Sequence, residues 1–353
     1  MRRSYYVCEL LLACFLYAGV ATAANPPQPI PAFDYSSYLD VTATLTGLAA
    51  ANPDIAQVFS IGATYEGRQQ WVLHLTDFNN TATKPAIWFS CCIHARERIP
   101  VQVGLAFTTT ICTYKTDPAI TSLLHNLDIY VMPMSNPDGV TYNGCCQSVT
   151  CWRKNMELHH ERAYESSIPE NGSGTDPNRT WDYEWDYAGD AKIDQMVAYR
   201  GDQPVLAPMI HNIRKFTNTL LPRLVANIDC HSASGSVYYI YNGKYDSVAD
   251  AYHRNLLMAV AKGMGVITGY TVQEGNVLYL SAGDTNDAQE VLSGFMSFTI
   301  ETAYGVDNLF PYYSCELFTP PYPSDATTID INNNVQAWIY LLNVVNNGLY
   351  TNY

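Results

Sequence analysis

Three polar residues have the side-chain types that hold a catalytic metal ion. His94 and Glu97 are three positions apart, so both can reach one ion from a tight turn or from the start of a helix. A catalytic zinc site uses three protein ligands, often two histidines and one glutamate, and leaves a further position to water. His231, much later in the chain, is a candidate for the third ligand. Taken alone, a His–Glu pair that arose by chance and a histidine of the core are the simpler interpretations.

Strands and helices alternate along the chain around these residues. Short apolar, β-branched or aromatic runs predict buried strands at residues 71–75, 86–93, 127–134, 224–230, 237–241 and 297–300. Helical periodicity occurs at residues 38–51, 100–114, 252–263 and 329–345. The alternation predicts an α/β fold of one domain, in which helices cover both faces of a mixed, mostly parallel twisted sheet.

Three candidate residues directly follow predicted strands. They are His94, His231 and Glu301. In sheets of this kind, ligands bind beyond the carboxyl ends of the strands. Residues 142–190 have little periodicity, and a loop of that length usually carries function. The sequence therefore predicts a site at the carboxyl edge of the sheet.

The N-terminal segment and the net charge restrict the class of protein. Residues 1–23 combine a basic start, an apolar stretch and small residues at Ala21 and Ala23, which predicts an export signal cleaved after Ala23. No later segment supplies the roughly 20 apolar residues of a membrane span. The formal net charge of -14 argues against nucleic acid as a partner. We therefore expect a secreted, extracellular, monomeric protein whose single domain covers residues 24–353.

The cysteines leave two interpretations open. Cys8 and Cys14 lie in the predicted signal, and an even number remains, which favours disulfides in an exported chain. The remaining cysteines are Cys91, Cys92, Cys112, Cys145, Cys146, Cys151, Cys230 and Cys315. The loop at residues 145–151 suits crosslinks, whereas the cysteines in apolar strand-like runs also suit buried thiols.

Several further motifs occur in a fixed order from Tyr38 to the C-terminus. They are Tyr65-Glu66-Gly67-Arg68, His94-Ala95-Arg96-Glu97, Asn136-Pro137-Asp138-Gly139, Trp152-Arg153-Lys154, Asp176-Pro177-Asn178-Arg179-Thr180-Trp181, Tyr199-Arg200-Gly201, His231-Ser232 and Ser297-Phe298-Thr299-Ile300-Glu301. In this order they resemble the zinc carboxypeptidase family, which includes the pancreatic carboxypeptidases A and B. Any one motif can be accidental, but the ordered series is hard to obtain by chance. The resemblance implies one catalytic domain with a sheet of about eight strands.

The resemblance also implies the metal site. One zinc ion per chain would be bound by His94, Glu97 and His231, and Glu301 would act as general base and acid. This is physically reasonable, because zinc lowers the pKa of its water towards ~7 and a nearby carboxylate can then take the proton. The same carboxylate would deliver the proton to the departing amine.

Other matching residues would handle the substrate. Arg153 matches the family residue that stabilises the oxyanion, and Asp176 matches a carboxylate that orients His94 through its other ring nitrogen. Arg96 would add positive charge along the peptide path.

The free C-terminal carboxylate of the substrate needs a separate clamp. Asn178, Arg179 and Tyr279 match that clamp, and the planar fork of an arginine suits a carboxylate. Asn178 also begins a glycosylation motif, but a glycan there would block the clamp, so we expect Asn178 to be unmodified. Asn79 and Asn171 lie in polar loop sequence and are better acceptors.

The preference for the C-terminal residue depends on a different set of side chains. In the family, the residue seven positions after the clamp tyrosine lies at the bottom of the side-chain pocket, and here it is Asn286. Asp284, Asp287 and Glu274 lie near it in sequence. These residues favour a polar, acidic pocket and a basic or polar C-terminal residue. Alternatively, the acids face helices or solvent.

The predicted function is a secreted, zinc-dependent carboxypeptidase that hydrolyses the C-terminal peptide bond of peptides and proteins. The short segment between the signal and the first helix leads us to expect activity without zymogen cleavage. One alternative is a zinc amidohydrolase that deacylates small N-acyl amino acids. A second is an inactive member kept as a binding module, which the retained ligands and base disfavour.

Overall fold

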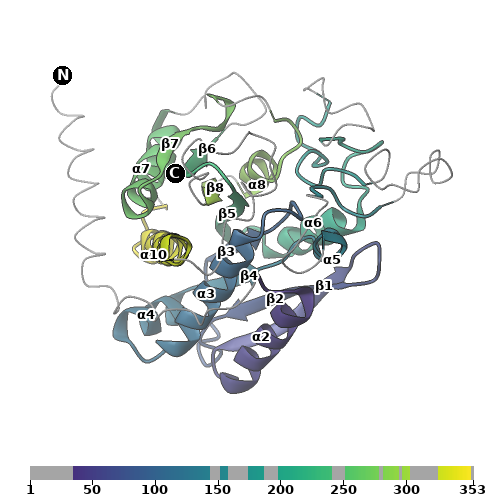
Figure 1. Cartoon of the computed structure of the whole chain (residues 1–353). Coiled ribbons are helices and arrows are strands. Elements are labelled where there is room, and N and C mark those ends of the chain that lie inside the picture. Colours follow the sequence, from purple (N-terminus) through teal and green to yellow (C-terminus); the bar gives the residue numbers. More distant parts are fainter. Residues whose placement is uncertain are drawn as a thin grey trace, which may run out of the picture.

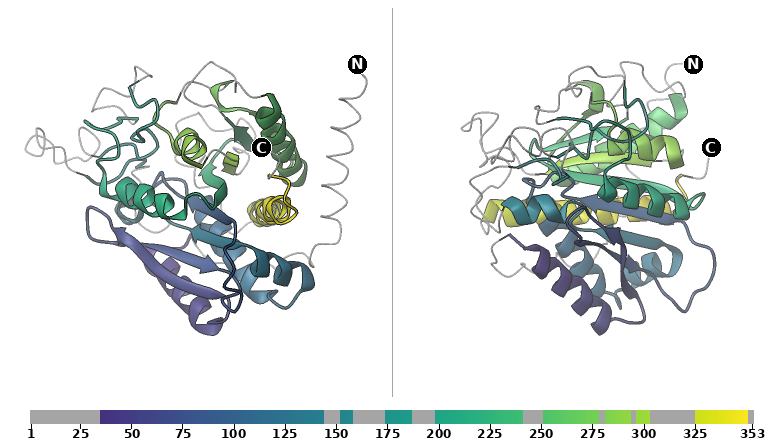
Figure 2. Two further views of the ribbon diagram at one scale, coloured as in Figure 1. Left: turned by 180° about the vertical axis from the view of Figure 1, so that it is seen from behind. Right: turned by 90° about the vertical axis from the view of Figure 1, so that its right-hand side faces the viewer.

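The computed structural model describes residues 35–143, 152–157, 174–186, 198–240, 251–277, 281–293, 296–302 and 325–350. Within these residues, one sheet of eight strands crosses the molecule and helices cover both of its faces (Figures 1 and 2). The α/β fold predicted from the sequence is therefore confirmed. Outside the described residues lie the predicted signal and Tyr279, as well as Cys145, Cys146, Cys151, Cys315 and Asn171.

The sheet is mixed, with a parallel centre. Its strands are β1 (Ala56–Ala63), β2 (Gln69–Leu75), β3 (Ala86–Cys91), β4 (Asp128–Met132), β5 (Leu224–Ser232), β6 (Ser236–Tyr239), β7 (Thr271–Glu274) and β8 (Met296–Thr302). Their order is β1-β2-β4-β3-β5-β8-β6-β7. Strands β4, β3, β5 and β8 run parallel, whereas β1, β2 and β4 pair antiparallel at one side and β6 runs antiparallel to β8.

The helices are α2 (Tyr38–Ala51), α3 (Ile99–Thr113), α4 (Pro118–Asn126), α5 (Pro137–Asn143), α6 (Pro208–Leu220), α7 (Ala251–Thr268), α8 (Thr285–Ser293) and α10 (Asp325–Asn346). A short 3₁₀ turn, Gly275–Val277, follows β7. Helix α2 has the predicted bounds, and Ser37 and Asp40 form a capping box that fixes its start. In the described part of the chain, no helix combines the length and the apolar character that crossing a bilayer requires.

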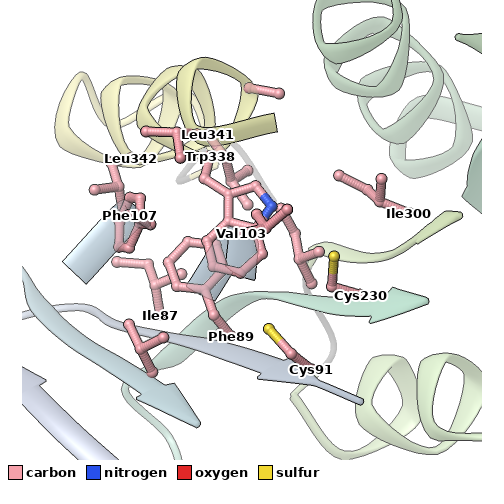
Figure 3. Packing of buried hydrophobic residues seen from close by; sticks show 14 of the residues in the cluster. Ile87, Phe89, Cys91, Val103, Phe107, Cys230, Ile300, Trp338, Leu341 and Leu342 are labelled. Atoms are coloured by element: carbon pink, nitrogen blue, oxygen red, sulfur yellow. The ribbon is translucent and has the colours of Figure 1, made fainter. Parts of the chain in front are cut away.

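One face of the sheet carries the larger part of the core. Phe89 of β3 stacks on Trp338 of α10 with ring centroids 4.5 Å apart, and Phe107 of α3 packs against both rings (Figure 3). Cys91 and Cys230 point into the same layer. All four described cysteines, which also include Cys92 and Cys112, are free and buried, so the interpretation as buried thiols is confirmed for those in strand-like runs.

The opposite face of the central strands carries the polar residues. Successive side chains of a strand alternate between the two faces. Because Ile228, Cys230 and Ile300 belong to the core on the α3 and α10 side, the intervening residues Asp229, His231 and Glu301 lie on the face towards α6 and α8. His231 and Glu301 are register partners on adjacent parallel strands. This pairing brings a candidate ligand and the candidate base together.

Candidate metal centre

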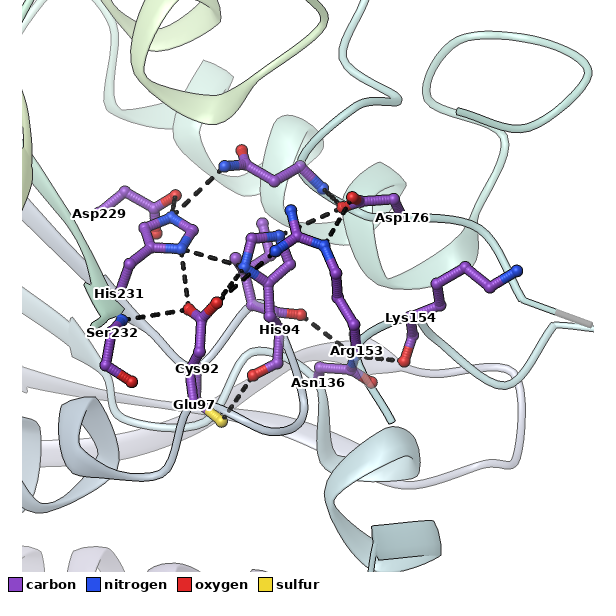
Figure 4. A network of polar contacts seen from close by, with 12 residues as sticks. Cys92, His94, Glu97, Asn136, Arg153, Lys154, Asp176, Asp229, His231 and Ser232 are labelled. Atoms are coloured by element: carbon purple, nitrogen blue, oxygen red, sulfur yellow. Dashed lines mark hydrogen bonds and ion pairs between the residues drawn. The ribbon is translucent and has the colours of Figure 1, made fainter. Parts of the chain in front are cut away.

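Three buried side chains converge at the carboxyl end of the parallel strands (Figure 4). His94 Nδ1 lies 2.7 Å from Glu97 Oε1. His231 Nδ1 lies 3.0 Å from Glu97 Oε2 and 3.2 Å from His94 Nδ1. The structure therefore brings together the three residues that the sequence proposed as metal ligands.

Different elements supply these ligands. His94 and Glu97 lie in the turn between β3 and α3, where the Glu97 amide donates to the His94 carbonyl over 3.1 Å. His231 lies inside β5, and Glu301 lies inside β8, because both strands extend past the predicted ends. Regular strand backbone therefore fixes both residues, which the sequence placed directly after the ends of the predicted strands.

The donor set fits a divalent cation. The two Nδ1 atoms face each other, and the other nitrogen of each ring already contacts a carboxylate: His94 Nε2 lies 3.2 Å from Asp176 Oδ1, and His231 Nε2 lies 2.9 Å from Asp229 Oδ2. When a metal is bound, each ring can therefore keep its proton on Nε2 and offer the lone pair of Nδ1 to the ion. Donors around tetrahedral zinc are about 3.3 Å apart, which is close to the observed spacing.

The charges of the ligands depend on their burial and on their neighbours. Burial, with Arg153 adding to it, lowers the pKa of His94. Burial opposes ionisation of Glu97, but His94 and His231 outweigh it and hold the pKa of Glu97 well below its usual range. Burial likewise opposes the charge on His231, but Asp229 and Glu97 outweigh it and raise the pKa of His231 well above its usual value. Protons therefore compete with a metal ion for this site.

Arg153 and Asp176 flank the ligands on one side (Figure 4). Arg153 Nε donates to Asp176 Oδ2 over 2.8 Å, and its Nη1 lies 3.7 Å from Glu97 Oε1. Burial opposes ionisation of Asp176, but Arg153 and His94 hold its pKa well below its usual range. The carboxylate thus links the guanidinium to the imidazole of His94.

A cleft of about 450 Å³, partly open to solvent, adjoins the ligands. Its described lining residues are His94, Arg153, Asn178, Arg179, His231, Tyr238, Gly275, Ser281, Asp284, Thr299 and Glu301. Burial and the nearby Glu97 raise the pKa of Glu301 to about 7. The cleft therefore combines a metal-binding set, a carboxylate that can exchange a proton near neutral pH, and two guanidinium groups.

A family model described as zinc carboxypeptidase matches residues 41–322, which is most of the chain. The chain belongs to the zinc carboxypeptidase family. Members of this family use one zinc ion, and the buried donor set supplies ligands suited to it.

Known carboxypeptidases are similar to this chain in sequence. Carboxypeptidase A6 of Mus musculus is 30% identical over 263 residues, which cover 72% of this chain and 56% of that relative. The zinc carboxypeptidase of Saccharothrix mutabilis subsp. capreolus is 28% identical over 278 residues, covering 76% of this chain and 61% of the relative. The chain thus spans less than two thirds of the length of these curated relatives.

Solved structures show the same fold. Bovine thrombin-activatable fibrinolysis inhibitor, in complex with tick carboxypeptidase inhibitor, has a TM-score of 0.75 and 25% identity, with 89% of this chain and 98% of that chain covered. Carboxypeptidase A from Helicoverpa armigera has a TM-score of 0.70 and 20% identity, with 94% and 78% covered. The second likeness concerns the fold alone.

The residues that match the family's carboxylate clamp lie in the cleft. Asn178 Oδ1 accepts hydrogen bonds from the backbone N–H and the Oγ1 hydroxyl of Thr285, over 2.8 and 2.9 Å. This fixes the amide so that its NH₂ group lies on the cleft side, 3.4 Å from His231 Nε2. Arg179 Nη1 donates to the Asn178 carbonyl. Tyr279, the third residue predicted for the clamp, lies outside the described residues.

The predicted pocket residues separate into two groups. Asp284 lines the cleft, and its carboxylate accepts hydrogen bonds from Ser281 Oγ and from the Asp287 amide in the first turn of α8. Asn286 is buried and accepts a 2.6 Å hydrogen bond from Ser297 Oγ. Neither Asn286 nor Arg96 belongs to the described lining of the cleft. Of these pocket candidates, Asp284 is therefore the one that lines the cleft.

Asp229 is a residue of the site that sequence reasoning missed. It lies two positions before His231 on β5, so both side chains lie on the same face. The local signal was a carboxylate inside an otherwise apolar strand, since a buried acid requires a partner.

Proposed function

We propose that this protein is a secreted, zinc-dependent carboxypeptidase that removes the C-terminal residue of peptides. The observation that carries the proposal is the cluster of His94, Glu97 and His231 donors beside a cleft that Glu301 and Arg179 also line. Residues 24–353 would form the catalytic domain, and the mature protein would be an extracellular monomer.

The chemistry is divided among few side chains. Zinc, held by the two histidines and Glu97, would acidify a water molecule and polarise the scissile carbonyl. The Glu301 carboxylate would accept the proton of the water and then donate it to the departing amine. The guanidinium of Arg153 would stabilise negative charge on the carbonyl oxygen, for which a fixed cation in a shielded site is effective.

The substrate class is tested by comparing three compounds. An N-blocked dipeptide, its C-terminal amide and an N-acetyl amino acid are each incubated with the purified protein, and the release of free amino acid is measured. We expect rapid cleavage of the dipeptide alone. Faster hydrolysis of the N-acetyl amino acid than of the dipeptide would contradict the proposal and favour the deacylase alternative.

Substitution of Arg179 should weaken the recognition of the substrate carboxylate. Hydrogen bonds to charged groups contribute about 1.5–3 kcal/mol, so Arg179→Ala should lower kcat/KM by roughly 10- to 100-fold. Arg179→Lys should recover only part of this loss, because an ammonium lacks the planar fork. The decisive measurement is the ratio of dipeptide to dipeptide amide cleavage, which should be large for the wild type and near one for Arg179→Ala. An unchanged ratio would remove Arg179 from the clamp.

Asp284 should set a preference for basic C-terminal residues. Asp284→Asn keeps a side chain that can cap α8 but removes the charge. We expect the ratio of kcat/KM for C-terminal Lys to that for C-terminal Leu to fall roughly 10-fold. Asp287→Asn, in the first turn of α8 but outside the described lining of the cleft, is the matched control. Equal or faster cleavage of C-terminal Leu by the wild type would contradict the assignment.

A further inference from the structure

We infer that Asp229 is a positioning residue that orients His231 as a metal ligand and retains the metal in the site. The inference rests on the ligand set proposed above and goes beyond it, because it concerns the neighbour that holds one of the ligands. Its basis is the contact between Asp229 Oδ2 and His231 Nε2 at 2.9 Å, deep in the sheet.

The contact selects one tautomer of His231. A carboxylate accepts hydrogen bonds, so when a metal is bound Nε2 carries the proton and Nδ1 is left to offer its lone pair to the ion. Nδ1 is the atom that faces His94 and Glu97. The nearby Asn178 NH₂ group cannot replace the carboxylate, because Thr285 already fixes that amide with its oxygen turned away. Asp229 therefore both aims the ring and increases the basicity of its metal-facing nitrogen.

The sheet holds Asp229 rigidly in this position. Ser90 Oγ donates to Asp229 Oδ1 over 2.8 Å, and Ser90, Asp229 and Thr299 are register partners across β3, β5 and β8. Asp229 is 0% exposed and Ser90 is 2% exposed. A hydrogen bond between neighbouring strands at the centre of a sheet leaves the carboxylate little freedom to turn away from His231.

Asp229 and Asp176, the carboxylate that contacts His94, differ in their charged neighbours (Figure 4). Asp176 is bound directly by the guanidinium of Arg153. Within the described part of the chain, the hydrogen-bond partners of Asp229 are Ser90 and His231, and neither is a permanent cation. A buried carboxylate without a compensating positive charge is costly. A cation bound by the ligands would therefore place a compensating positive charge next to His231, on the side away from Asp229.

The test measures zinc binding directly, on the full mature chain. Zinc affinity is determined by competition with a chromophoric chelator, and zinc release is followed after addition of excess chelator. Asp229→Asn keeps the size of the side chain and removes its charge. Loss of such outer carboxylates typically weakens metal binding 10- to 100-fold, so we expect a decrease in that range and faster release. Ser90→Ala should give a smaller loss in the same direction.

The matched control is Asp128→Asn. Asp128 also contacts a histidine, His74, at 2.9 Å, but it lies at the start of β4, at the amino end of the parallel strands. This variant should bind zinc like the wild type. The inference would be overturned if Asp128→Asn and Asp229→Asn lost the same amount of zinc affinity. It would also be overturned if Asp229→Asn bound and released zinc like the wild type. If Asp229→Asn does not fold, the zinc affinity and release of Ser90→Ala are compared with those of Asp128→Asn instead. Wild-type values in Ser90→Ala would then overturn the inference.

A separate variant keeps the two proposals distinguishable. His231→Ala should abolish stoichiometric zinc binding if the ligand set is right. Zinc retained by His231→Ala would overturn the ligand set itself. Zinc lost by His231→Ala and fully retained by Asp229→Asn would overturn only the role of Asp229.

Discussion

Glu301→Gln should fold, bind zinc and lose nearly all peptidase activity. The amide cannot take a proton from water, and the loss of a general acid–base group typically lowers kcat by about 10²- to 10⁴-fold. Because Glu301 lines the cleft beside Arg153 and His231, the substitution leaves the ligands and the clamp in place. The measurement is kcat on a blocked dipeptide, together with zinc content.

The pH dependence of the wild type gives a second test of Glu301. The base must be ionised, so kcat/KM should fall as the pH falls through the pKa of this carboxyl. Burial and Glu97 raise that pKa to about 7, and a bound cation lowers it, since it favours the anion. The acidic limb should therefore lie at or below about pH 7, and it should be absent from the residual activity of Glu301→Gln.

Glu290→Gln is the control for this experiment. Glu290 is also buried, burial raises its pKa, and it contacts His253 outside the described lining of the cleft. Its substitution should leave kcat within a few-fold of the wild type. A Glu301→Gln variant with near wild-type kcat would show that another group takes the proton.

Removal of zinc should abolish the activity. A metal that polarises a carbonyl contributes several kcal/mol of transition-state stabilisation, so chelation should lower kcat by about 10³-fold or more. Added zinc should restore the wild type. His231→Ala should remain inactive after the same addition, because the two remaining ligands, His94 and Glu97, are not enough to hold the ion in place.

The same experiment predicts a pH trend for metal binding. In the absence of metal, Asp229 and Glu97 outweigh burial and raise the pKa of His231. A proton therefore occupies this histidine over a wide range below that pKa, and zinc affinity should fall as the pH is lowered. His74→Ala, which removes a histidine that contacts Asp128 instead of the ligands, should leave zinc content unchanged. Full activity after exhaustive chelation would contradict the metal mechanism.

Local signals explain which elements the sequence predicted well. Helix α2 begins at Tyr38, as expected, because its capping box lies within four consecutive residues. Strands β1 and β7 were missed because they lie at the two edges of the sheet and consist mostly of half-buried residues. Such strands lack the continuous apolar run that marks a buried strand. Helix α5 is too short to show helical periodicity. Helix α4 was missed although Ile120, Leu123 and Leu124 have helical spacing, because the run covers little more than two turns.

The two residues that the sequence named first for the side-chain pocket, Asn286 and Asp284, lie in different surroundings. Asn286 matches the family's pocket position, yet it is directed to Ser297 of β8, whereas Asp284 lines the cleft. Asp284 caps α8, so the start of this helix decides which of the two side chains lines the cleft. The exact turn at which a helix begins depends on packing against the sheet, which a spacing rule does not include.

By itself, the sequence determined the residue types, their order and the family, because motifs such as His94-Ala95-Arg96-Glu97 are local and can be identified without a fold. Only the tertiary structure decided which side chains meet. His231 faces Glu301, and Asp229 faces Ser90, through the register of parallel strands that lie far apart in the chain. Register results from the packing of the whole sheet, and a shift of one residue would turn each of these side chains to the other face.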